Sequence, residues 1–159
     1  MNAPKKPAPR PRTDFGYFNP ISTRWMDNDV YGHVNNVVYY SWFDTAVNAY
    51  LVEQGVLDPA TSAVIGLVVN TTCNYFSSVA FPDMIEAGVT VAHIGKSSVR
   101  YEVGIFKKGA SLTAAHGHFV HVYVDRVTQR PVPLPGALRE ALLRLQPSAP
   151  GHPDHNSAA

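Results

Sequence analysis

Two acidic residues, a glycine, a histidine and a pair of asparagines lie close together in residues 24–36. This segment reads Arg-Trp-Met-Asp-Asn-Asp-Val-Tyr-Gly-His-Val-Asn-Asn. A long helix is predicted to begin at its end, where unpaired backbone N–H groups carry the positive end of the helix dipole. Acyl transfer needs a carboxylate that acts as nucleophile or base, together with donors that stabilise an oxyanion. We therefore take this segment as the candidate active site.

The residues of this segment are expected to take different roles. Asp29 is the candidate catalytic carboxylate, although an aspartate here can also simply cap the turn before the helix. Asp27 shares its strand parity with Asp29 and is interpreted as a structural residue that orders the loop. Gly32 is either a plain turn glycine or one that lets the backbone approach a bound group closely. His33 is either structural or catalytic, and Asn36 falls in the first helical turn, where a free backbone donor is expected.

The element that must position these residues is one long helix, predicted over Asn36–Gln54. Asn35 or Asn36 can cap its start, and Gly55 is a natural end. The helix is apolar on most of its circumference, and its few polar residues form one narrow stripe, so it is predicted to be buried. The residues of this stripe are Ser41, Asp44, Thr45 and Asn48.

Strands are expected to cover this helix. A first strand is predicted at Ile21–Met26, and a short helix at Gly136–Leu145 follows the last strand. Closely spaced strands pair antiparallel, and strands of about nine residues match the length of the helix. The expected arrangement is therefore one curved antiparallel sheet around the helix. Its remaining strands are predicted at Val64–Val79, Met84–Gly95, Ser98–Lys107 and Leu112–Val127.

Length and composition predict one globular domain, because the 159 residues are 45% hydrophobic and 16% charged. A net charge of +1 does not favour a nucleic-acid partner, and no apolar run reaches the roughly 20 residues of a membrane span. The single cysteine, Cys73, is expected to be a small buried residue in a protein of the reducing cytoplasm. We expect disordered tails at residues 1–14 and 147–159 and a domain at residues 15–146.

Histidines in the last predicted strand invite a metal-site interpretation, which strand geometry opposes. His116 and His118 share one face of that strand, whereas His121 lies on the other. Ligands on opposite faces of one regular strand cannot converge, and no cysteine or glutamate completes a set. The sequence therefore predicts no metal site and no other cofactor.

With this order of elements, the sequence resembles the hotdog-fold thioesterases, in the branch of 4-hydroxybenzoyl-CoA thioesterase and short acyl-CoA thioesterases. The resemblance covers residues 17–145 and rests mainly on the pattern D-x-D-x-x-G-H-V-N-N of residues 27–36, followed by Tyr39 and Trp42. The His-Val-Asn-Asn part also resembles plant-type acyl-carrier-protein thioesterases. Weaker matches are Phe-Pro-Asp at residues 81–83 and Gly-Lys-Ser-Ser at residues 95–98.

The resemblance implies an α+β hotdog fold, in which a curved antiparallel β-sheet wraps around one long central helix. It also implies an acyl-CoA thioesterase that releases a free acid and CoA without a cofactor. In this family pattern Asp29 is the nucleophile or general base, and the backbone N–H of Asn36 meets the thioester carbonyl. Gly32 and His33 then shape the pocket.

Substrate binding and assembly follow from the same resemblance. Lys96, with Ser97 and Ser98, is the best candidate for the phosphates of CoA, because it coincides with a turn in the resemblance. Open strand edges predict a homodimer with one continuous sheet, or a homotetramer as in relatives. The alternatives are an acyl-carrier-protein thioesterase, a non-catalytic protein that binds acyl thioesters, and a hotdog-type enoyl-CoA hydratase, which fits the Gly-His-Val-Asn-Asn run poorly. Both aliphatic and aromatic acyl groups remain open.

Overall fold

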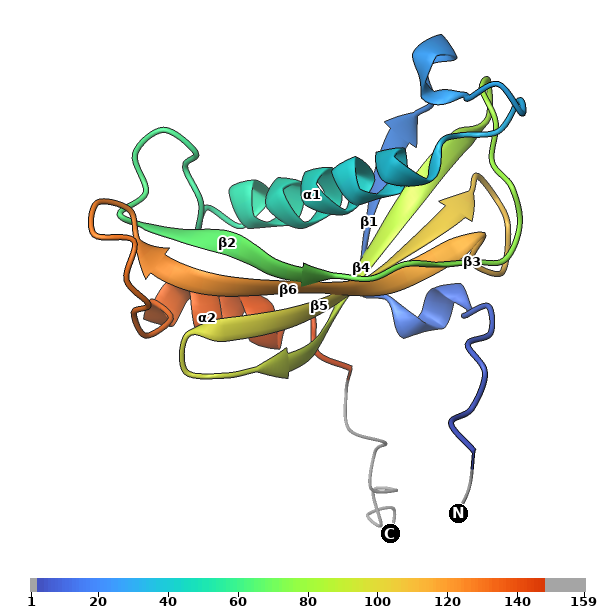
Figure 1. Cartoon of the computed structure of the whole chain (residues 1–159). Helices are drawn as coiled ribbons and strands as arrows, with labels where there is room; N and C mark the ends of the chain where they lie inside the picture. Colours follow the sequence, from blue (N-terminus) through green and yellow to red (C-terminus); the bar gives the residue numbers. More distant parts are fainter. Residues whose placement is uncertain (1–2, 148–159) are drawn as a thin grey trace, which may run out of the picture.

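A computed structural model describes residues 3–147 and shows a long helix, α1, lying across a curved antiparallel sheet (Figure 1). The strands are arranged in the order β1-β4-β5-β6-β2, and β3 pairs with β6 beyond the end of β2. The α+β hotdog fold is therefore confirmed. The elements are η1 (Arg12–Asp14), β1 (Tyr17–Ser22), η2 (Trp25–Asp27), α1 (Asn36–Glu53), β2 (Val64–Thr71), β3 (Asn74–Tyr75), β4 (Met84–Ile94), β5 (Ser98–Lys107), β6 (Ala115–Asp125) and α2 (Gly136–Leu143).

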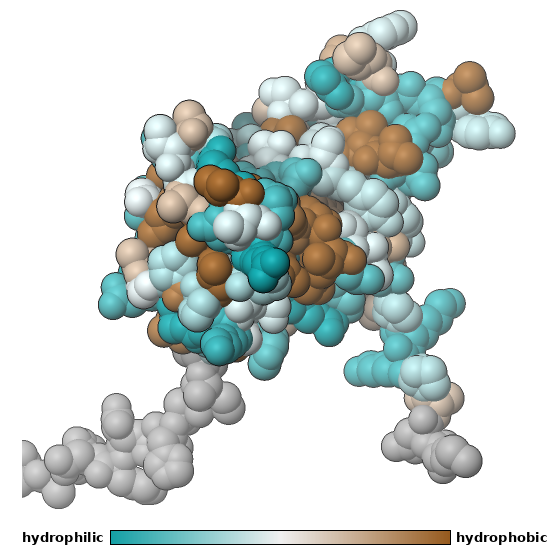
Figure 2. All heavy atoms as spheres, turned by 60° about the vertical axis from the view of Figure 1, so that its left-hand side comes forward, coloured by the Kyte–Doolittle hydropathy of each residue, from teal (hydrophilic) through white to brown (hydrophobic). Residues whose placement is uncertain are grey.

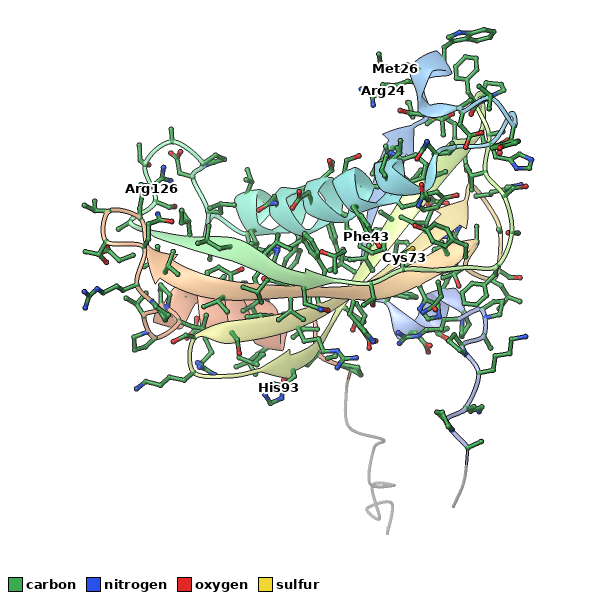
Figure 3. The ribbon with its side chains drawn as sticks, in the orientation of Figure 1. Arg24, Met26, Phe43, Cys73, His93 and Arg126 are labelled. Atoms are coloured by element: carbon green, nitrogen blue, oxygen red, sulfur yellow. The ribbon has the colours of Figure 1, made fainter. Side chains whose placement is uncertain are left out.

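The long helix begins and ends where its capping residues predict. The side chain of Asn35 accepts a hydrogen bond from the backbone N–H of Val37 (3.1 Å), and Gly55 follows the helix with a φ of +69°. Phe43 lies between α1 and the sheet, above Cys73 (Figure 3). The buried face of α1 consists of Tyr39, Trp42, Phe43, Ala46, Val47, Tyr50 and Leu51.

One flank of α1 stays uncovered in the protomer. Val37, Tyr40 and Val52 on this helix are exposed, as are Leu67 and Val68 on the edge strand β2. Figure 2, which brings the left-hand end of Figure 1 forward, also shows apolar residues gathered in patches between polar ones. The helix is thus buried by the sheet on one side only.

The alternation predicted for β5 is confirmed on the face towards α1, where Val99, Tyr101, Val103 and Ile105 are fully buried. The opposite face is also covered, because the N-terminal segment crosses it. Phe15 of this segment packs so closely that a methyl group at Gly104 would lie 2.6 Å from its ring. Glycine at this position therefore lets the segment approach the sheet.

The N-terminal segment is held by charges as well as by Phe15. Arg10 pairs with Glu102, and its backbone N–H donates to the hydroxyl of Thr113 (2.9 Å). Arg12 pairs with Glu86 (2.7 Å). Part of the tail predicted at residues 1–14 is therefore ordered, since residues 10–14 dock on the sheet. The tail predicted at residues 147–159 lies outside the described residues, apart from Pro147.

The strand predicted at Ile21–Met26 is wrong in its bounds, because β1 ends at Ser22 and a 3₁₀ turn follows. The carboxylate of Asp27 accepts a hydrogen bond from the backbone N–H of Arg24 (2.7 Å), which closes this turn. Residues 17–20, which precede the predicted strand, also pair with β4.

The predicted strand Val64–Val79 is two strands. The chain crosses close over β6 at Thr72, whose carbonyl oxygen would lie 1.7 Å from a methyl group at Gly117. Only a glycine in β6 permits this crossing. The remaining strands and α2 are a few residues shorter at one or both ends than predicted, except β5, whose bounds are confirmed.

The helix α2 packs against the end of β4, and the hydroxyl of Tyr50 on α1 donates to the carbonyl of Ala141 on α2 (2.6 Å). Within residues 3–147, neither helix combines the length and hydropathy that a membrane span requires.

We predict that Phe15→Ala lowers the free energy of unfolding by about 3 kcal/mol, because it removes a buried ring from the outer face of the sheet. Chemical denaturation measures this change. Thr13→Ala, at an exposed position of the same segment, is the control and should change stability by less than about 0.5 kcal/mol. Equal stability of the Phe15 variant and the wild type would show that the segment does not dock in solution.

Candidate active site

The loop before α1 is closed by its own backbone. The N–H of Asp29 donates to the carbonyl of His33 (2.9 Å), and the N–H of Gly32 donates to the carbonyl of Asp29 (3.0 Å). Gly32 has a φ of +79°, in the left-handed region that favours glycine. This tight turn brings Asp29 and His33 together, so Gly32 has the turn role that the sequence suggested.

Asp27 supports this loop from beneath. Its side chain is only 1% exposed and accepts hydrogen bonds from the backbone N–H and the Nε of Arg24 (2.7 and 2.9 Å). Its backbone carbonyl accepts a further bond from the N–H of Asn35, the residue that caps α1 (2.8 Å). The structural role predicted for Asp27 is thus confirmed.

Asp29 has a different environment. It is half-buried, and its Oδ1 accepts a hydrogen bond from the backbone N–H of Tyr31 (2.9 Å). Within residues 3–147 its Oδ2 has no hydrogen-bond partner. One carboxylate oxygen therefore orients the side chain, while the other remains available for chemistry.

The start of α1 supplies a free donor beside Asp29. Asn35 uses its side chain to cap the helix, whereas the N–H of Asn36 makes no hydrogen bond in the described part of the chain. The hydroxyl of Tyr75, on β3, donates to the carbonyl of Asn36 (3.1 Å) and ties β3 to this helix end. The N–H of Asn36 can therefore donate to a bound group.

Asp29, His33 and Asn36 line one open cavity of about 590 Å³. The rings of Tyr39 and Tyr75 pack edge to face on its wall, with centroids 5.0 Å apart. Burial raises the pKa of Tyr39 to about 12, and burial also raises the pKa of Tyr75, so both phenols are neutral near pH 7. The full lining is Asp29, Tyr31, His33, Val34, Asn36, Tyr39, Tyr75, Phe76, Ser77 and Ser78.

The wall formed by residues 75–78 was missed in the sequence. This segment was assigned to a long strand, whose alternation gives no reason to place successive residues at one cavity. Because the strand stops at Tyr75, Phe76 to Ser78 form a loop that faces the start of α1. The only local signal was the pair of serines after two aromatic residues.

Apolar side chains also surround the outer end of the loop. Trp25, Met26, Val30 and Tyr31 are all more than 70% exposed, and Trp25 packs edge to face on Phe81. Arg24 and Met26 lie at this outer end, whereas Arg126 lies at the other end of the molecule (Figure 3).

Lys96, Ser97 and Ser98 are not at this cavity. Lys96 and Ser97 lie in the turn between β4 and β5, and Ser98 begins β5, at the opposite end of the sheet from the loop before α1 (Figure 1). The carbonyls of Lys96 and Ser97 accept backbone hydrogen bonds from Leu134 and Tyr123 (2.9 and 2.7 Å). In a single protomer this turn is thus part of the packing beside α2.

The basic residue beside the cavity is instead Lys6. It lines a neighbouring hollow of about 440 Å³ whose wall includes Tyr75 and Phe76, which also line the Asp29 cavity. Nothing in the sequence pointed to this placement, because the segment was expected to be a tail.

The histidines of β6 alternate as predicted. His116 and His118 are partly exposed on the outer face, whereas His121 is buried on the face towards α1. His33 is exposed, and its ring has no hydrogen-bond partner among residues 3–147. The same residues contain no group of three His, Cys, Asp or Glu side chains placed to bind one metal ion.

Comparisons with known proteins identify related chains. The sequence matches the Thioesterase-like superfamily over residues 23–142. It is 55% identical to the PA5185 protein of Pseudomonas aeruginosa strain PAO1, over 89% of this chain and 99% of that one, and the structures agree with a TM-score of 0.86. The PA2801 protein of Pseudomonas aeruginosa, a proposed thioesterase, is 27% identical over 79% of this chain and 96% of that one, with a TM-score of 0.72.

Two more distant matches are a solved structure and a curated sequence. A 1,4-dihydroxy-2-naphthoyl-CoA thioesterase from Synechocystis is 14% identical over 80% of this chain and 95% of that one, with a TM-score of 0.72. The uncharacterized protein YsmA of Bacillus subtilis is 25% identical over 88 residues, which cover 55% of this chain and 59% of that protein.

We predict that Asp27→Asn destabilises the fold, whereas Asp29→Asn does not. Asp27→Asn should lower the free energy of unfolding by about 2 kcal/mol, because the buried carboxylate loses its charged hydrogen bonds with Arg24. Asp29→Asn should leave stability nearly unchanged, because an amide oxygen can still accept the bond from Tyr31. Chemical denaturation of both variants measures the difference, and equal stabilities would contradict these roles.

Proposed function

The chain belongs to the Thioesterase-like superfamily, and we propose that it is an acyl-CoA thioesterase that hydrolyses an acyl-CoA to the free acid and CoA. Membership of the family supports thioester hydrolysis in general. The observation that carries the proposal is the placement of Asp29 and the unpaired N–H of Asn36 on one cavity. Thioester hydrolysis requires a carboxylate and an oxyanion donor in this relation.

In the proposed reaction, the thioester carbonyl lies against the start of α1 with its oxygen at the N–H of Asn36. The free oxygen of Asp29 either attacks the carbonyl carbon or takes a proton from an attacking water. Negative charge then develops on the carbonyl oxygen, where the N–H and the helix dipole stabilise it. When the tetrahedral intermediate collapses, the C–S bond breaks and CoA leaves as the thiolate. With water as the nucleophile, this step gives the free acid directly. With Asp29 as the nucleophile, it leaves a mixed anhydride, and water then hydrolyses this anhydride to the free acid and the Asp29 carboxylate.

Gly32 and His33 are proposed to shape this pocket. Gly32 permits the turn that holds Asp29 beside the helix start, since its φ of +79° disfavours residues with a side chain. His33 lies on the cavity wall, and its ring has no hydrogen-bond partner among residues 3–147, so it is placed to hydrogen-bond a substrate. A general-base role for His33 is the second choice after Asp29.

The nucleotide end of CoA carries several phosphate charges, and Lys6 is proposed to meet them. Lys6 lines the hollow that shares Tyr75 and Phe76 with the Asp29 cavity. Lys96, Ser97 and Ser98 remain candidates only for a cavity that belongs to another subunit, because their own protomer holds them at the far end of the sheet.

We propose that two chains pair along the β2 edge to form a homodimer with one continuous sheet, which can assemble further into a homotetramer. Leu67, Val68 and Val69 expose apolar surface on this edge, next to the uncovered flank of α1. The other edge, β1, is short and contains Pro20, which blocks regular pairing. A cytoplasmic location is proposed from the single cysteine alone.

We predict that Asp29→Asn lowers the rate of thiol release from acyl-CoA by about 10³-fold, because the amide can neither attack nor accept a proton. The assay follows free CoA with a thiol reagent. Asp125→Asn is the matched control, because Asp125 also accepts a backbone N–H through Oδ1 (2.9 Å, from Val127) but lies far from the cavity. Full activity of Asp29→Asn would refute the assignment, and no hydrolysis of any acyl-CoA by the wild type would favour a binding protein.

We predict that Lys6→Gln raises KM for acyl-CoA about five-fold without changing kcat, because the lost contact is with the phosphates and not with the reacting atoms. Steady-state kinetics at low salt measure this effect. Lys108→Gln, in the exposed turn after β5, serves as the control and should leave KM unchanged. An equal KM for wild type and Lys6→Gln would remove Lys6 from the substrate site.

We predict that light scattering at micromolar concentration gives twice or four times the mass of one chain. Leu67→Lys should lower this mass, because it places a charge on the proposed edge. A monomeric wild-type protein would contradict the proposed assembly.

A further inference from the structure

His121 is a buried histidine that the proposed reaction does not use. Its side chain lies on β6 towards α1 and is 2% exposed. The two ring nitrogens are the only fully inaccessible side-chain nitrogen or oxygen atoms of residues 3–147 that lack a hydrogen-bond partner. Buried polar groups are normally paired, so an unpaired imidazole suggests a missing ligand.

The ring of His121 faces a small cavity of about 220 Å³ between the second half of α1 and the sheet. Gly66, on β2, keeps the space beside the ring open, because a methyl group there would lie 2.8 Å from Nδ1. Tyr123 also lines the cavity, but its hydroxyl already pairs with that of Tyr101 (2.7 Å). The remaining lining is mainly apolar and consists of Asn48, Leu51, Leu57, Pro59 and Ile65.

Charge and size define what this cavity can hold. Burial lowers the pKa of His121 to about 4, so the imidazole is neutral near pH 7 and offers one N–H donor and one acceptor. A hydroxyl group can pair with either nitrogen. An apolar cavity of about 150 Å³ is known to hold benzene, so this one accommodates a hydroxylated group of about six to eight carbon atoms.

The cavity lies along the same sheet edge as the Asp29 cavity, but at the other end. Gly66 pairs with Tyr123 of β6, whereas Tyr75 pairs with Ala115, eight residues or about 26 Å away along that strand. The two cavities of one protomer are therefore separate. If two chains pair antiparallel along β2, as proposed above, the two-fold axis reverses the direction of α1. The His121 cavity of one subunit would then lie on the side of the Asp29 cavity of the other.

We propose that the His121 cavity receives the far end of the acyl group whose thioester lies at Asp29 of the partner subunit, and that His121 selects acyl groups with a hydroxyl there. This assignment rests on the proposed thioesterase function and on the dimer. His121 is then a residue that determines specificity, and the substrate class is the CoA esters of hydroxylated acids.

Matched pairs of substrates test the assignment. We would compare kcat/KM for hexanoyl-CoA with 6-hydroxyhexanoyl-CoA, and for octanoyl-CoA with 8-hydroxyoctanoyl-CoA. In at least one of the two pairs, the wild type should have a kcat/KM about ten-fold higher for the hydroxylated ester than for the plain one. His121→Phe should reduce this ratio of kcat/KM values to about one while still hydrolysing the plain esters. His118→Phe, on the outer face of the same strand, is the control and should keep the preference. A ratio near one for both pairs in the wild type, or an unchanged ratio in His121→Phe, would overturn the proposal.

Mixed dimers test whether the cavity acts across the interface. In a dimer of one Asp29→Asn chain and one His121→Phe chain, the intact Asp29 and the intact His121 belong to different subunits. They act on the same substrate only if the site is built across the interface. The hydroxyl preference, absent from His121→Phe dimers, should therefore return in the mixed dimer. Its continued absence would contradict the arrangement across subunits.

A binding measurement separates this proposal from the proposed function. Phenol should shift the ring ¹⁵N signals of His121 in NMR spectra, and benzene should shift them less. If no acyl-CoA is hydrolysed but phenol still binds at His121, the thioesterase proposal fails and the hydroxyl site stands. If phenol has no effect and the substrate ratios do not depend on His121, the cavity holds at most water and the proposal fails. Gly66→Ala, which fills the space beside Nδ1, replaces His121→Phe if that variant does not fold.

Discussion

The packing of α1 against the curved sheet is the interaction on which the rest of the structure depends. Seven side chains of this helix are buried, and each buried large apolar side chain contributes about 1.5–3 kcal/mol. The same packing fixes the N-terminal end of the helix beside the loop of Asp27 and Asp29. The core thus determines where an unpaired backbone N–H meets a carboxylate.

The two aspartates of the loop before α1 make different contacts. Asp27 is buried and bonded to Arg24 and to the helix cap, whereas Asp29 keeps one oxygen free on the cavity. Two carboxylates two residues apart therefore have different surroundings, since one is buried beneath the loop and the other presents an oxygen to the cavity.

Much of this arrangement could be predicted from the sequence. The periodicity of α1, its asparagine cap and Gly55 gave its bounds to within one residue, and the alternation of β5 identified its buried face. The pattern of residues 27–36 predicted which side chains gather at the helix start. These features depend on residues close together in the chain, so the spacing of residue types is enough to predict them.

Contacts between distant segments could not be predicted in this way. Phe15 docks on the sheet because Gly88 and Gly104 leave room for its ring, and Arg10 pairs with Glu102 nearby. No local pattern reveals these matches. The break between β2 and β3 likewise depends on Gly117, more than 40 residues later in the chain. For the same reason the sequence gives no signal that Lys96 lies away from the Asp29 cavity of its own protomer, or that Lys6 lines the neighbouring hollow.

The most direct test of the central claim is a crystal structure of the protein with a ketone analogue of an acyl-CoA, in which a methylene group replaces the sulfur. The account predicts that the ketone oxygen lies about 2.9 Å from the backbone nitrogen of Asn36, with Asp29 facing the carbonyl carbon. An analogue bound with its carbonyl away from the start of α1 would contradict it.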